Sequence, residues 1–274
     1  MIKLRFILEA SKNIFYPVFS GHIIRGAILA IIKEKKSDIA QILHDSNKMR
    51  QYSVSPLNYH NAKWTNRGEL AIQLGDTLDF QLNIFDKKIE DDVLHIFEHE
   101  VIDSITLFQD IFTIKKIEVT RKNVEDLLAN HQNIPNKFRI VFLTPTYFSI
   151  SKQVFPLRLP DPRYLLSNVS RIWNCFNKDM QVDEEMLFEW VTNNISISGY
   201  ELKTEAVNVS KGVPKIGFKG WTNYNINPKN SEYIKWVDIL LQFAEFSNVG
   251  GSRTAGFGCV KYIPNMDISR TEKL

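Results

Sequence analysis

A glycine-rich segment near the end of the chain has residue types that suggest a chemical role. Residues 250–258 read Gly-Gly-Ser-Arg-Thr-Ala-Gly-Phe-Gly and separate a helix-like run from a strand-like run. Glycine permits positive φ angles and close backbone approach, so N–H groups can face an anion. We therefore predict phosphate contacts at Gly250, Gly251, Gly256 and Gly258, with Arg253 as a cation. Alternatively, the glycines only end a helix and begin a bulged strand.

The spacing within this loop argues against two common nucleotide-binding motifs. No Gly-Lys-Ser/Thr sequence follows the glycines, so the mononucleotide signature is missing. The loop also leads from a helix into a strand, whereas the dinucleotide fingerprint leads from a strand into a helix. ATP and NAD are therefore not expected as ligands.

Composition predicts a packed, soluble cytoplasmic protein. The chain has 274 residues, of which 44% are apolar, and this suits two domains with two cores. The formal net charge is only +3, so a nucleic-acid surface would have to be a local basic face. Cys175 and Cys259 lack the spacing of a metal site or a disulfide framework. The first residues alternate like a strand rather than a signal peptide, and the aliphatic run 27–32 is too short to span a bilayer.

Hydrophobic periodicity gives the same order of elements twice along the chain. In the first half we predict a strand at 2–9, helices at 21–33 and 37–44, strands at 51–56, 69–73 and 77–85, a helix at 87–100 and an extended run at 104–120. In the second half we predict a strand at 138–143, helices at 161–176 and 183–193, a hairpin at 200–226, a helix at 231–248 and a strand at 258–263. Each half is a split βαβ pattern, which indicates an α+β fold of two tandem ferredoxin-like, RRM-like domains. We place these domains at 1–125 and 136–264, followed by a polar tail at 265–274.

In this layout and in several local motifs, the chain resembles the Cas-six family of CRISPR RNA-processing endoribonucleases, which belong to the RAMP superfamily. The resemblance covers the whole chain. It rests on the helix phrase at 19–27, on Leu43-His44-Asp45 leading to the segment 52–57, and on the loop that ends with residues 253–258 before a strand. The segments 158–171 and 217–221 also look like the second domain of archaeal and bacterial members. The resemblance implies the fold and an RNA substrate.

His44 is the histidine that best matches the catalytic segment of this family. In metal-independent RNA cleavage the 2′-hydroxyl attacks the adjacent phosphorus, which requires a base, an acid and cations for the charged phosphorane. Histidine suits proton transfer near neutral pH. His44 ends a predicted helix beside Asp45, with Lys48 and Arg50 close in sequence. We predict catalytic roles for His44, Lys48 and Arg50; the alternative for His44 is a polar helix cap.

His22 is the second candidate for proton transfer. It lies at the start of the first predicted helix beside Arg25, and a helix N-terminus favours a bound phosphate while disfavouring a protonated ring. The family often supplies a tyrosine from this helix, but the residue one turn after Arg25 is Leu29. The pair His95 and His99 has helical spacing without further metal ligands, so we expect a solvated helix face and no metal site.

Other basic residues are candidates for RNA contact. Lys35 and Lys36 follow the first helix in a charge run, which is usually solvated but can guide RNA. Lys215 and Lys219 alternate with aromatic residues along the predicted hairpin, a pattern that fits phosphate contact and base stacking as well as core packing. Arg171 lies on the outward side of a predicted helix. The resemblance supports RNA contact at Lys215 and Lys219, and Arg25, Lys35, Lys36 and Arg171 are further predicted RNA contacts.

The resemblance implies a metal-independent endoribonuclease that cuts CRISPR repeat RNA and leaves a 2′,3′-cyclic phosphate and a 5′-hydroxyl. We expect no cofactor, and we expect repeat RNA as the partner, with effector-complex subunits or a second copy of the chain as further partners. One alternative is a non-catalytic RAMP subunit that only binds guide RNA. A small-molecule enzyme of the same fold would need a pocket with clustered carboxylates, and the sequence shows none.

Overall fold

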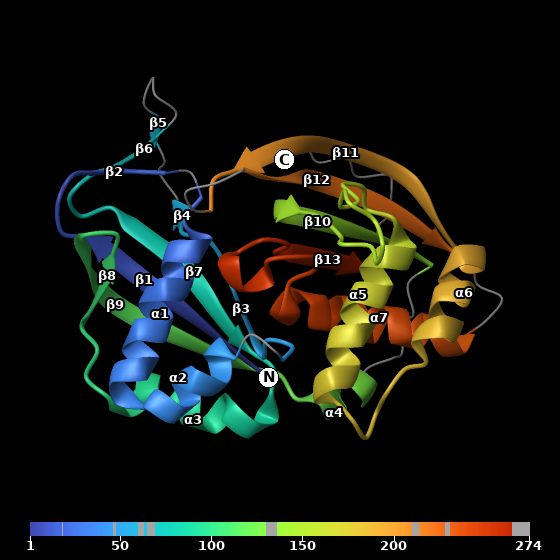
Figure 1. The fold of residues 1–274 in the computed structure, drawn as a ribbon, viewed down its shortest axis with the longest axis horizontal. Helices are drawn as coiled ribbons and strands as arrows, with labels where there is room; N and C mark the ends of the chain where they lie inside the picture. The colour runs from blue at the N-terminus through green and yellow to red at the C-terminus, as the bar shows by residue number, and fades with distance from the viewer. Residues whose placement is uncertain are drawn as a thin grey trace.

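A computed structural model describes residues 1–17, 19–45, 48–59, 63–64, 69–129, 136–209, 214–227 and 231–264. It shows an α+β protein with two main antiparallel sheets, each covered by helices on one face (Figure 1). The α+β class predicted from the sequence is confirmed. The predicted tail at 265–274 lies outside the described residues.

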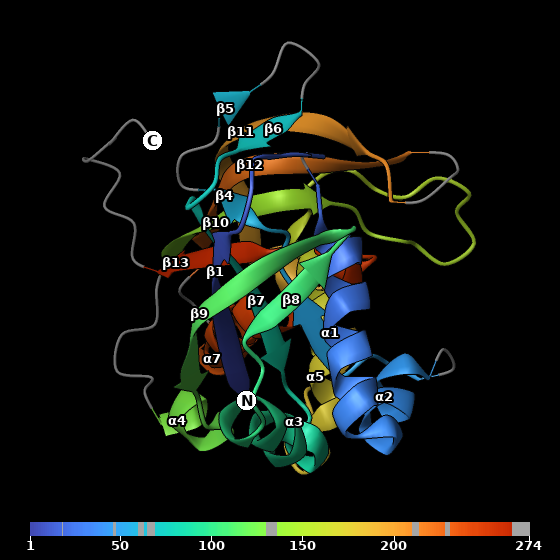
Figure 2. The same cartoon turned by 90° about the vertical axis from the view of Figure 1, so that its left-hand side faces the viewer.

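The first sheet has the strand order β3-β7-β1-β9-β8, and β4 pairs with β7. Its strands are β1 (Ile2–Ala10), β3 (Tyr52–Val54), β4 (Asn58–Tyr59), β7 (Thr77–Ile84), β8 (Ser104–Leu107) and β9 (Asp110–Arg121). Strict alternation in β1 buries Ile2, Leu4 and Phe6 on one face. That face packs with α1 (Gly21–Lys35), α2 (Ser37–His44) and α3 (Lys87–His99) in one core, and α1 and α2 lie side by side (Figure 2).

The second sheet has the order β11-β12-β10-β13. Its strands are β10 (Lys137–Thr146), β11 (Ile195–Val207), β12 (Lys215–Ile226) and β13 (Val260–Pro264). One face packs against α5 (Pro162–Phe176), α6 (Glu184–Asn194) and α7 (Ser231–Ser247), and Phe142, Trp173 and Phe243 are fully buried between these layers. The strand order and the helix connections therefore repeat those of the first half, apart from the additional strands there.

Two details differ from the sequence prediction. The run 104–120, expected as one extended segment, is a hairpin of β8 and β9 in which Phe108 has a positive φ of 61°. The helix α4 (Val124–Ala129) extends into the segment between the predicted domains 1–125 and 136–264, and Leu127 is buried in the core of the second half. A small third sheet, formed by β2 (Ile14–Tyr16), β5 (Lys63–Trp64) and β6 (Leu70–Ile72), lies beside the first.

Aspartate caps explain where several helices begin. Asp86 accepts a hydrogen bond from the backbone N–H of Lys88 at the start of α3. Asp161 does the same for Arg163 in α5, where Pro162 takes the first helical position. Each cap satisfies a backbone donor that the helix leaves unpaired, and proline at the first position gives up a donor that has no helical partner. Among the described helices, none has the length and apolar character needed to cross a membrane.

The two halves are joined where β3 meets the C-terminal end of α7. The Oγ of Ser53 donates to the carbonyl oxygen of Phe246 at 2.5 Å, and the Nδ2 of Asn248 donates to the carbonyl oxygen of Val54 at 3.0 Å. Both polar side chains are buried, so these bonds are shielded from water. The junction fixes the end of α7, and thus the glycine-rich loop, against the first half of the protein.

Candidate functional site

His44 is the last residue of α2 and its side chain is exposed. The helix is anchored because Ile39, Ala40 and Leu43 are buried in the first core. The chain leaves the helical conformation at Asp45, whose ψ is 111°. The histidine therefore stands on a fixed element with its ring accessible to a substrate.

Two of the predicted cations lie beside His44. The Nη1 of Arg50 donates to the carbonyl oxygen of Leu43 at 2.9 Å, so the guanidinium caps the C-terminal end of α2. Lys48 is 74% exposed in its side chain, and its Nζ lies 3.5 Å from Asp45 Oδ2. A surface ion pair of this kind is weak and leaves the lysine available to a phosphate. The structure thus gives Arg50 a structural contact that the sequence did not predict.

His22 lies in the first turn of α1 and is half-buried. Burial, followed by the positive charge of Arg25, lowers the pKa of His22 below its ordinary value. Its Nδ1 atom is buried and makes no hydrogen bond within the described part of the chain. The structure therefore favours a neutral ring at this position, as the sequence predicts for a histidine at a helix N-terminus beside an arginine.

Tyr52 is a buried residue at this site that the sequence analysis did not select. Burial raises the pKa of its hydroxyl, and the nearby charges of Arg25 and Arg50 oppose that change. Its side chain also bonds that of Thr254 in the glycine-rich loop. Tyr52 therefore brings Arg25, Arg50 and the loop to one place. Its position in a strand-like run, seven residues after Asp45, gave no sign of these contacts.

The glycine-rich loop is built from positive-φ residues, but its glycine amides bond inside the protein. The N–H of Gly250 donates to Asn168 Oδ1 at 2.7 Å and that of Gly251 to the carbonyl oxygen of Tyr147 at 2.9 Å. The N–H of Gly256 donates to Arg253 O at 3.2 Å, and that of Gly258 to Pro145 O at 3.1 Å. The prediction that these four amides face phosphates is therefore wrong. The alternative, a helix end followed by a turn into a strand, describes the loop better.

Close packing explains why glycine is needed in and around this loop. A Cβ atom on Gly21 at the start of α1 would lie 2.3 Å from the carbonyl oxygen of Ala255. A Cβ atom on Gly258 would lie 1.8 Å from Val249 O, and φ there is +68°. The N-terminus of α1 and the short helix η1 (Arg253–Ala255) can therefore approach each other closely.

Arg253 is also placed differently from the prediction. It is only 7% exposed, and its Nη1 donates to the carbonyl oxygen of Ser247 at 2.7 Å. Its Nη2 lies 3.4 Å from the carbonyl oxygen of Arg50, and burial together with the charge of Arg171 lowers its pKa to about 10. The guanidinium thus ties the loop to the end of α7 and to the segment after His44. This buried position corrects the predicted phosphate contact.

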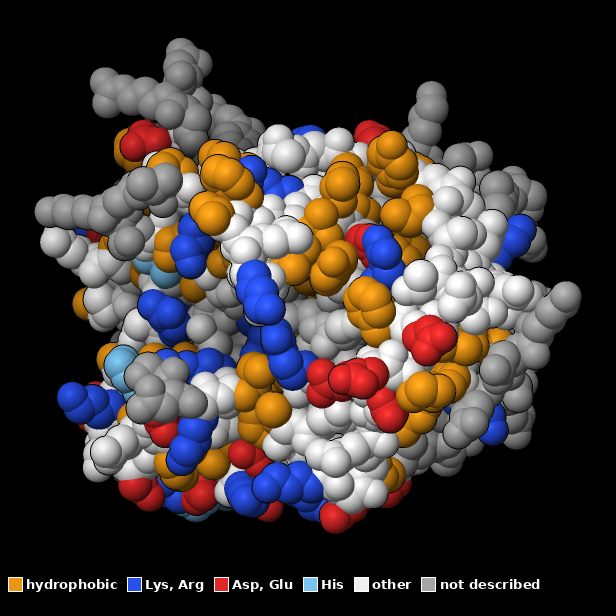
Figure 3. Space-filling view, turned by 45° about the vertical axis from the view of Figure 1, so that its right-hand side comes forward, with side chains coloured by type: hydrophobic (Ala, Val, Ile, Leu, Met, Phe, Trp, Pro, Cys, Tyr) orange, Lys and Arg blue, Asp and Glu red, His pale blue; other side chains and the backbone are white. Residues whose placement is uncertain are grey.

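Lys215 lies on the exposed side of the loop. Its Nζ is 2.6 Å from the Oγ of Ser252, which is also 2.7 Å from the hydroxyl of Tyr147. Arg171 is exposed on α5, close enough to Arg253 to affect its pKa. On the face shown in Figure 3, lysine and arginine side chains extend from the left part of the view to its middle, and histidine side chains lie at the left. Cations from both halves are therefore available near the loop.

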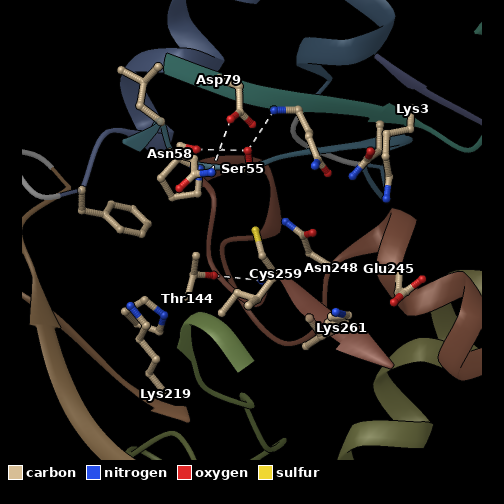
Figure 4. A pocket seen from close by; sticks show the side chains of 18 of the residues that line it. Lys3, Ser55, Asn58, Asp79, Thr144, Lys219, Glu245, Asn248, Cys259 and Lys261 are labelled. Carbon is tan, nitrogen blue, oxygen red and sulfur yellow. Dashed lines mark hydrogen bonds between the residues drawn. The ribbon is translucent and has the colours of Figure 1, made fainter. Parts of the chain in front are cut away.

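The remaining predicted RNA contacts lie elsewhere. Lys35 pairs with Glu100 at 3.3 Å and Lys36 with Asp92 at 2.7 Å, so both are directed toward α3 and its C-terminal end. Lys219 lines a cavity of about 510 Å³ between the two halves, with Lys3 and Asp79 on the opposite side (Figure 4). The structure thus brings Arg25 and Arg50 together near the loop, with His22 beside Arg25, while His44 and Lys48 lie in the segment that leads to Arg50. Lys35, Lys36 and Lys219 have other neighbours. In the described ranges, no three His, Cys, Asp or Glu side chains form a metal-binding group.

Comparison with known proteins finds similarity to one group of enzymes. The family model described as CRISPR-associated endoribonuclease Cas6 matches residues 140–260. The Cas6 endoribonuclease of Mycobacterium tuberculosis (strain CDC 1551 / Oshkosh) is 27% identical over 130 residues, which are 47% of this chain and 39% of that protein. The Streptococcus thermophilus Cas6 endoribonuclease is 24% identical over 153 residues, which are 54% of this chain and 60% of that protein. The chain therefore spans less than two thirds of the length of these curated relatives.

The similarity to solved structures extends over nearly the whole chain. A product complex of Thermus thermophilus Cas6 (TTHB231) has a TM-score of 0.76 at 20% identity and covers 96% of this chain and 99% of that chain. A product complex of Cas6 (TTHA0078) has a TM-score of 0.69 at 16% identity and the same coverage of both chains. The chain is thus an α+β protein with the fold of these Cas6 structures. In sequence the chain is similar to Cas6 CRISPR-associated endoribonucleases over residues 140–260, and in fold it is similar over nearly its whole length.

Proposed function

We propose that this protein binds CRISPR repeat RNA and cleaves precursor CRISPR RNA once within each repeat, without a metal ion. The observation that carries the proposal is the exposed His44 at the end of an anchored helix, with Lys48 and Arg50 beside it. The names of the related proteins support the same activity. The reaction would leave a 2′,3′-cyclic phosphate and a 5′-hydroxyl, as expected for attack by the 2′-hydroxyl.

In this proposal His44 transfers a proton during the attack or the departure of the 5′-oxygen. An exposed imidazole can exchange protons near neutral pH, and its anchored helix limits the reorganisation needed to reach the substrate. Lys48 would stabilise the developing negative charge on the phosphorane, because it is exposed and close in sequence to His44. Arg50 and Arg25 add positive charge around Tyr52.

RNA would be held by cations that surround this site. Arg25, Arg171 and Lys215 lie on α1, α5 and β12, so a bound strand would contact both halves of the protein. Lys215 with Ser252 and Tyr147 offers an ammonium and two hydroxyls to one phosphate. We also propose that the repeated strand order of the two sheets reflects two ferredoxin-like units, with the site at their junction.

A cleavage assay with end-labelled repeat RNA in excess EDTA tests the proposal. We expect cleavage by the wild-type protein, and a single-turnover rate reduced by ~100-fold or more for His44→Ala at nearly unchanged affinity. The control is His95→Ala, which removes another exposed histidine on α3 and should cleave normally. The products should carry a 3′ end that resists ligation until the cyclic phosphate is opened and removed.

The same assay separates the proposed enzyme from an RNA-binding subunit without catalysis. Tight binding of repeat RNA with no cleavage by the wild-type protein, with or without Mg²⁺, would establish the binding subunit. Equal cleavage rates for the wild-type protein and His44→Ala would instead assign the chemistry to another residue. His22→Ala is then the next variant to measure, and in our ranking it costs less than His44→Ala.

A further inference from the structure

The strand β11 forms one edge of the sheet of the second half. It pairs with β12 on one side, and no strand among the described residues pairs with it on the other. Figure 1 shows β11 as the outermost strand of that sheet. In an antiparallel pair, alternate residues direct their N–H and C=O groups away from the neighbouring strand. The free side of β11 therefore presents a row of backbone donors and acceptors.

The features that usually protect an edge strand are scarce in β11. The strand has 13 residues and contains no proline, which would remove a backbone donor. One register shift lies between Ile197 and Gly199, and after it the pairing with β12 is regular from Gly199 to Val207. A long and regular free edge is a template on which another strand can pair.

The charged side chains of this regular run alternate in sign. Glu201, Lys203 and Glu205 project from one face of the sheet. Across the pair with β12, Lys203 lies opposite Lys219, and like charges in such positions are unfavourable. Glu201 lies opposite Trp221, and neither Glu201 nor Lys203 forms an ion pair with another described residue. Both side chains are exposed, so opposite charges on the free side of β11 would stabilise them.

Apolar side chains occupy the opposite face of the same run. Tyr200 is 66% exposed and Leu202 is partly exposed. Both line a groove of about 450 Å³ together with Leu159, Pro162 and Val191. Tyrosine offers a large apolar ring with a polar tip, and an exposed tyrosine beside an apolar groove is typical of a protein–protein contact.

An antiparallel copy of β11 complements both faces of the strand in a single register. With a two-fold axis at Leu202, Glu201 of each copy lies opposite Lys203 of the other. Symmetry forms this contact twice. On the apolar face, Tyr200 lies opposite Thr204 of the second copy and diagonal to its Leu202, which is within reach of an aromatic ring. Charge complementarity therefore selects a second copy of this chain as the partner of β11.

We propose that β11 is a dimerisation surface, on which two copies of the chain pair antiparallel about Leu202 and join their four-stranded sheets into one. The inference goes beyond the proposed cleavage of RNA and does not depend on it. The surface belongs to the second half, whereas His44 ends α2 in the first half, on the other side of the molecule (Figure 1). Dimerisation through β11 therefore leaves His44 uncovered in both copies.

Sedimentation velocity of the full chain without RNA tests this surface. We expect a wild-type dimer at micromolar concentrations. Glu201→Lys and Lys203→Glu should each raise the dimer dissociation constant by ~10-fold or more, because symmetry places two like-charge contacts in the interface. The double variant with both changes restores opposite charges and should dimerise like the wild-type protein. Glu205→Lys is the matched control, since this side chain faces Gly199 of the second copy and its reversal should preserve the dimer.

A cysteine cross-link tests the register independently of charge. In a background of Cys175→Ser, which removes the exposed native thiol, Leu202→Cys should form a disulfide between two copies because these residues face each other. Thr204→Cys is the control, since its two counterparts lie about 14 Å apart. A monomeric wild-type protein, a dimer that tolerates both single charge reversals, or cross-linking at Thr204 in place of Leu202 would overturn the proposal. His44→Ala should dimerise normally, so loss of cleavage and loss of the dimer are separate results.

Discussion

Arg50 and Leu43 are joined by a hydrogen bond from Nη1 to the backbone carbonyl oxygen, 2.9 Å long, at the end of the helix that carries His44. A cation at this point satisfies one of the unpaired carbonyl groups of the helix terminus and complements its partial negative charge. The carbonyl oxygen of Arg50 in turn faces the Nη2 of Arg253, at 3.4 Å. The position of His44 is therefore linked to the glycine-rich loop through two arginines.

From this relationship we expect Arg50→Ala to slow cleavage by ~10-fold or more, because the end of α2 loses its cap and His44 loses its fixed position. The effect should fall mainly on the rate at saturating RNA. Lys48→Ala, which removes an exposed charge from the same segment, provides the comparison. If Arg50→Ala lowers only affinity and its salt dependence, Arg50 is a phosphate contact rather than a positioning residue.

A pH prediction follows from the lowered pKa of His22. Burial and the charge of Arg25 hold the folded-state pKa below the value of about 6.5 found in unfolded chains. As pH falls through 6.5, the unfolded state binds the proton first, so the stability that the neutral ring contributes is present above this pH and is lost below it. Urea unfolding at pH 7.5 and 5.5 measures this effect. Between these two pH values the free energy of unfolding should fall less for His22→Asn than for the wild-type protein.

The exposed His95 supplies the control for this measurement. Its replacement, His95→Asn, should leave the pH dependence of the unfolding midpoint unchanged. If the free energy of unfolding depends on pH in the same way in the wild-type protein and in His22→Asn, the folded protein does not disfavour the charged form of His22. A proton-transfer role for His22 near neutral pH would then become easier to support.

Sequence periodicity predicted most of the helices and strands, because the apolar residues of each element keep the helical or the strand period along its whole length. Helix α5 was predicted to within one residue at its start, since Asp161 and Pro162 form a clear N-terminal signal. The short strand β2 and the helix α4 were not predicted, because three to six residues contain too little periodic signal to separate them from loop. The sequence thus distinguished helix from strand wherever the segment was long.

The candidate site was only partly predictable for a different reason. His44 and Arg25 were selected from residue type, local context and the family resemblance; His44 is exposed and Arg25 is partly buried. The burial of Arg253 depends on contacts with Ser247 and with the segment after His44, which the folded chain brings together from distant positions. No local pattern distinguishes a buried arginine from an exposed one, so residue type alone assigned it to the surface.

Glycine substitutions test the structural role of the loop. Gly258→Ala should destabilise the protein by more than about 1 kcal/mol, since an alanine there must adopt positive φ and its Cβ would collide with the carbonyl of Val249. Gly26 offers the opposite case, because it lies inside α1 with no atom near its added Cβ. Gly26→Ala should stabilise the protein by about 0.5–1 kcal/mol. Chemical denaturation of both variants measures the two effects, and equal stabilities would refute the packing argument.

Arg253 provides the last prediction, because its buried guanidinium should act through stability rather than through direct RNA contact. Arg253→Met leaves the carbonyl oxygen of Ser247 without its charged donor and should lower the free energy of unfolding by about 2–4 kcal/mol. The salt dependence of RNA affinity should stay unchanged in the folded fraction, since no surface cation is lost. Arg171→Ala is the matched control: it removes an exposed arginine from α5, and if that residue contacts a phosphate the salt slope should fall by about 0.7 with little change in melting temperature. A reduced salt slope with normal stability in Arg253→Met would show instead that the side chain reaches the RNA.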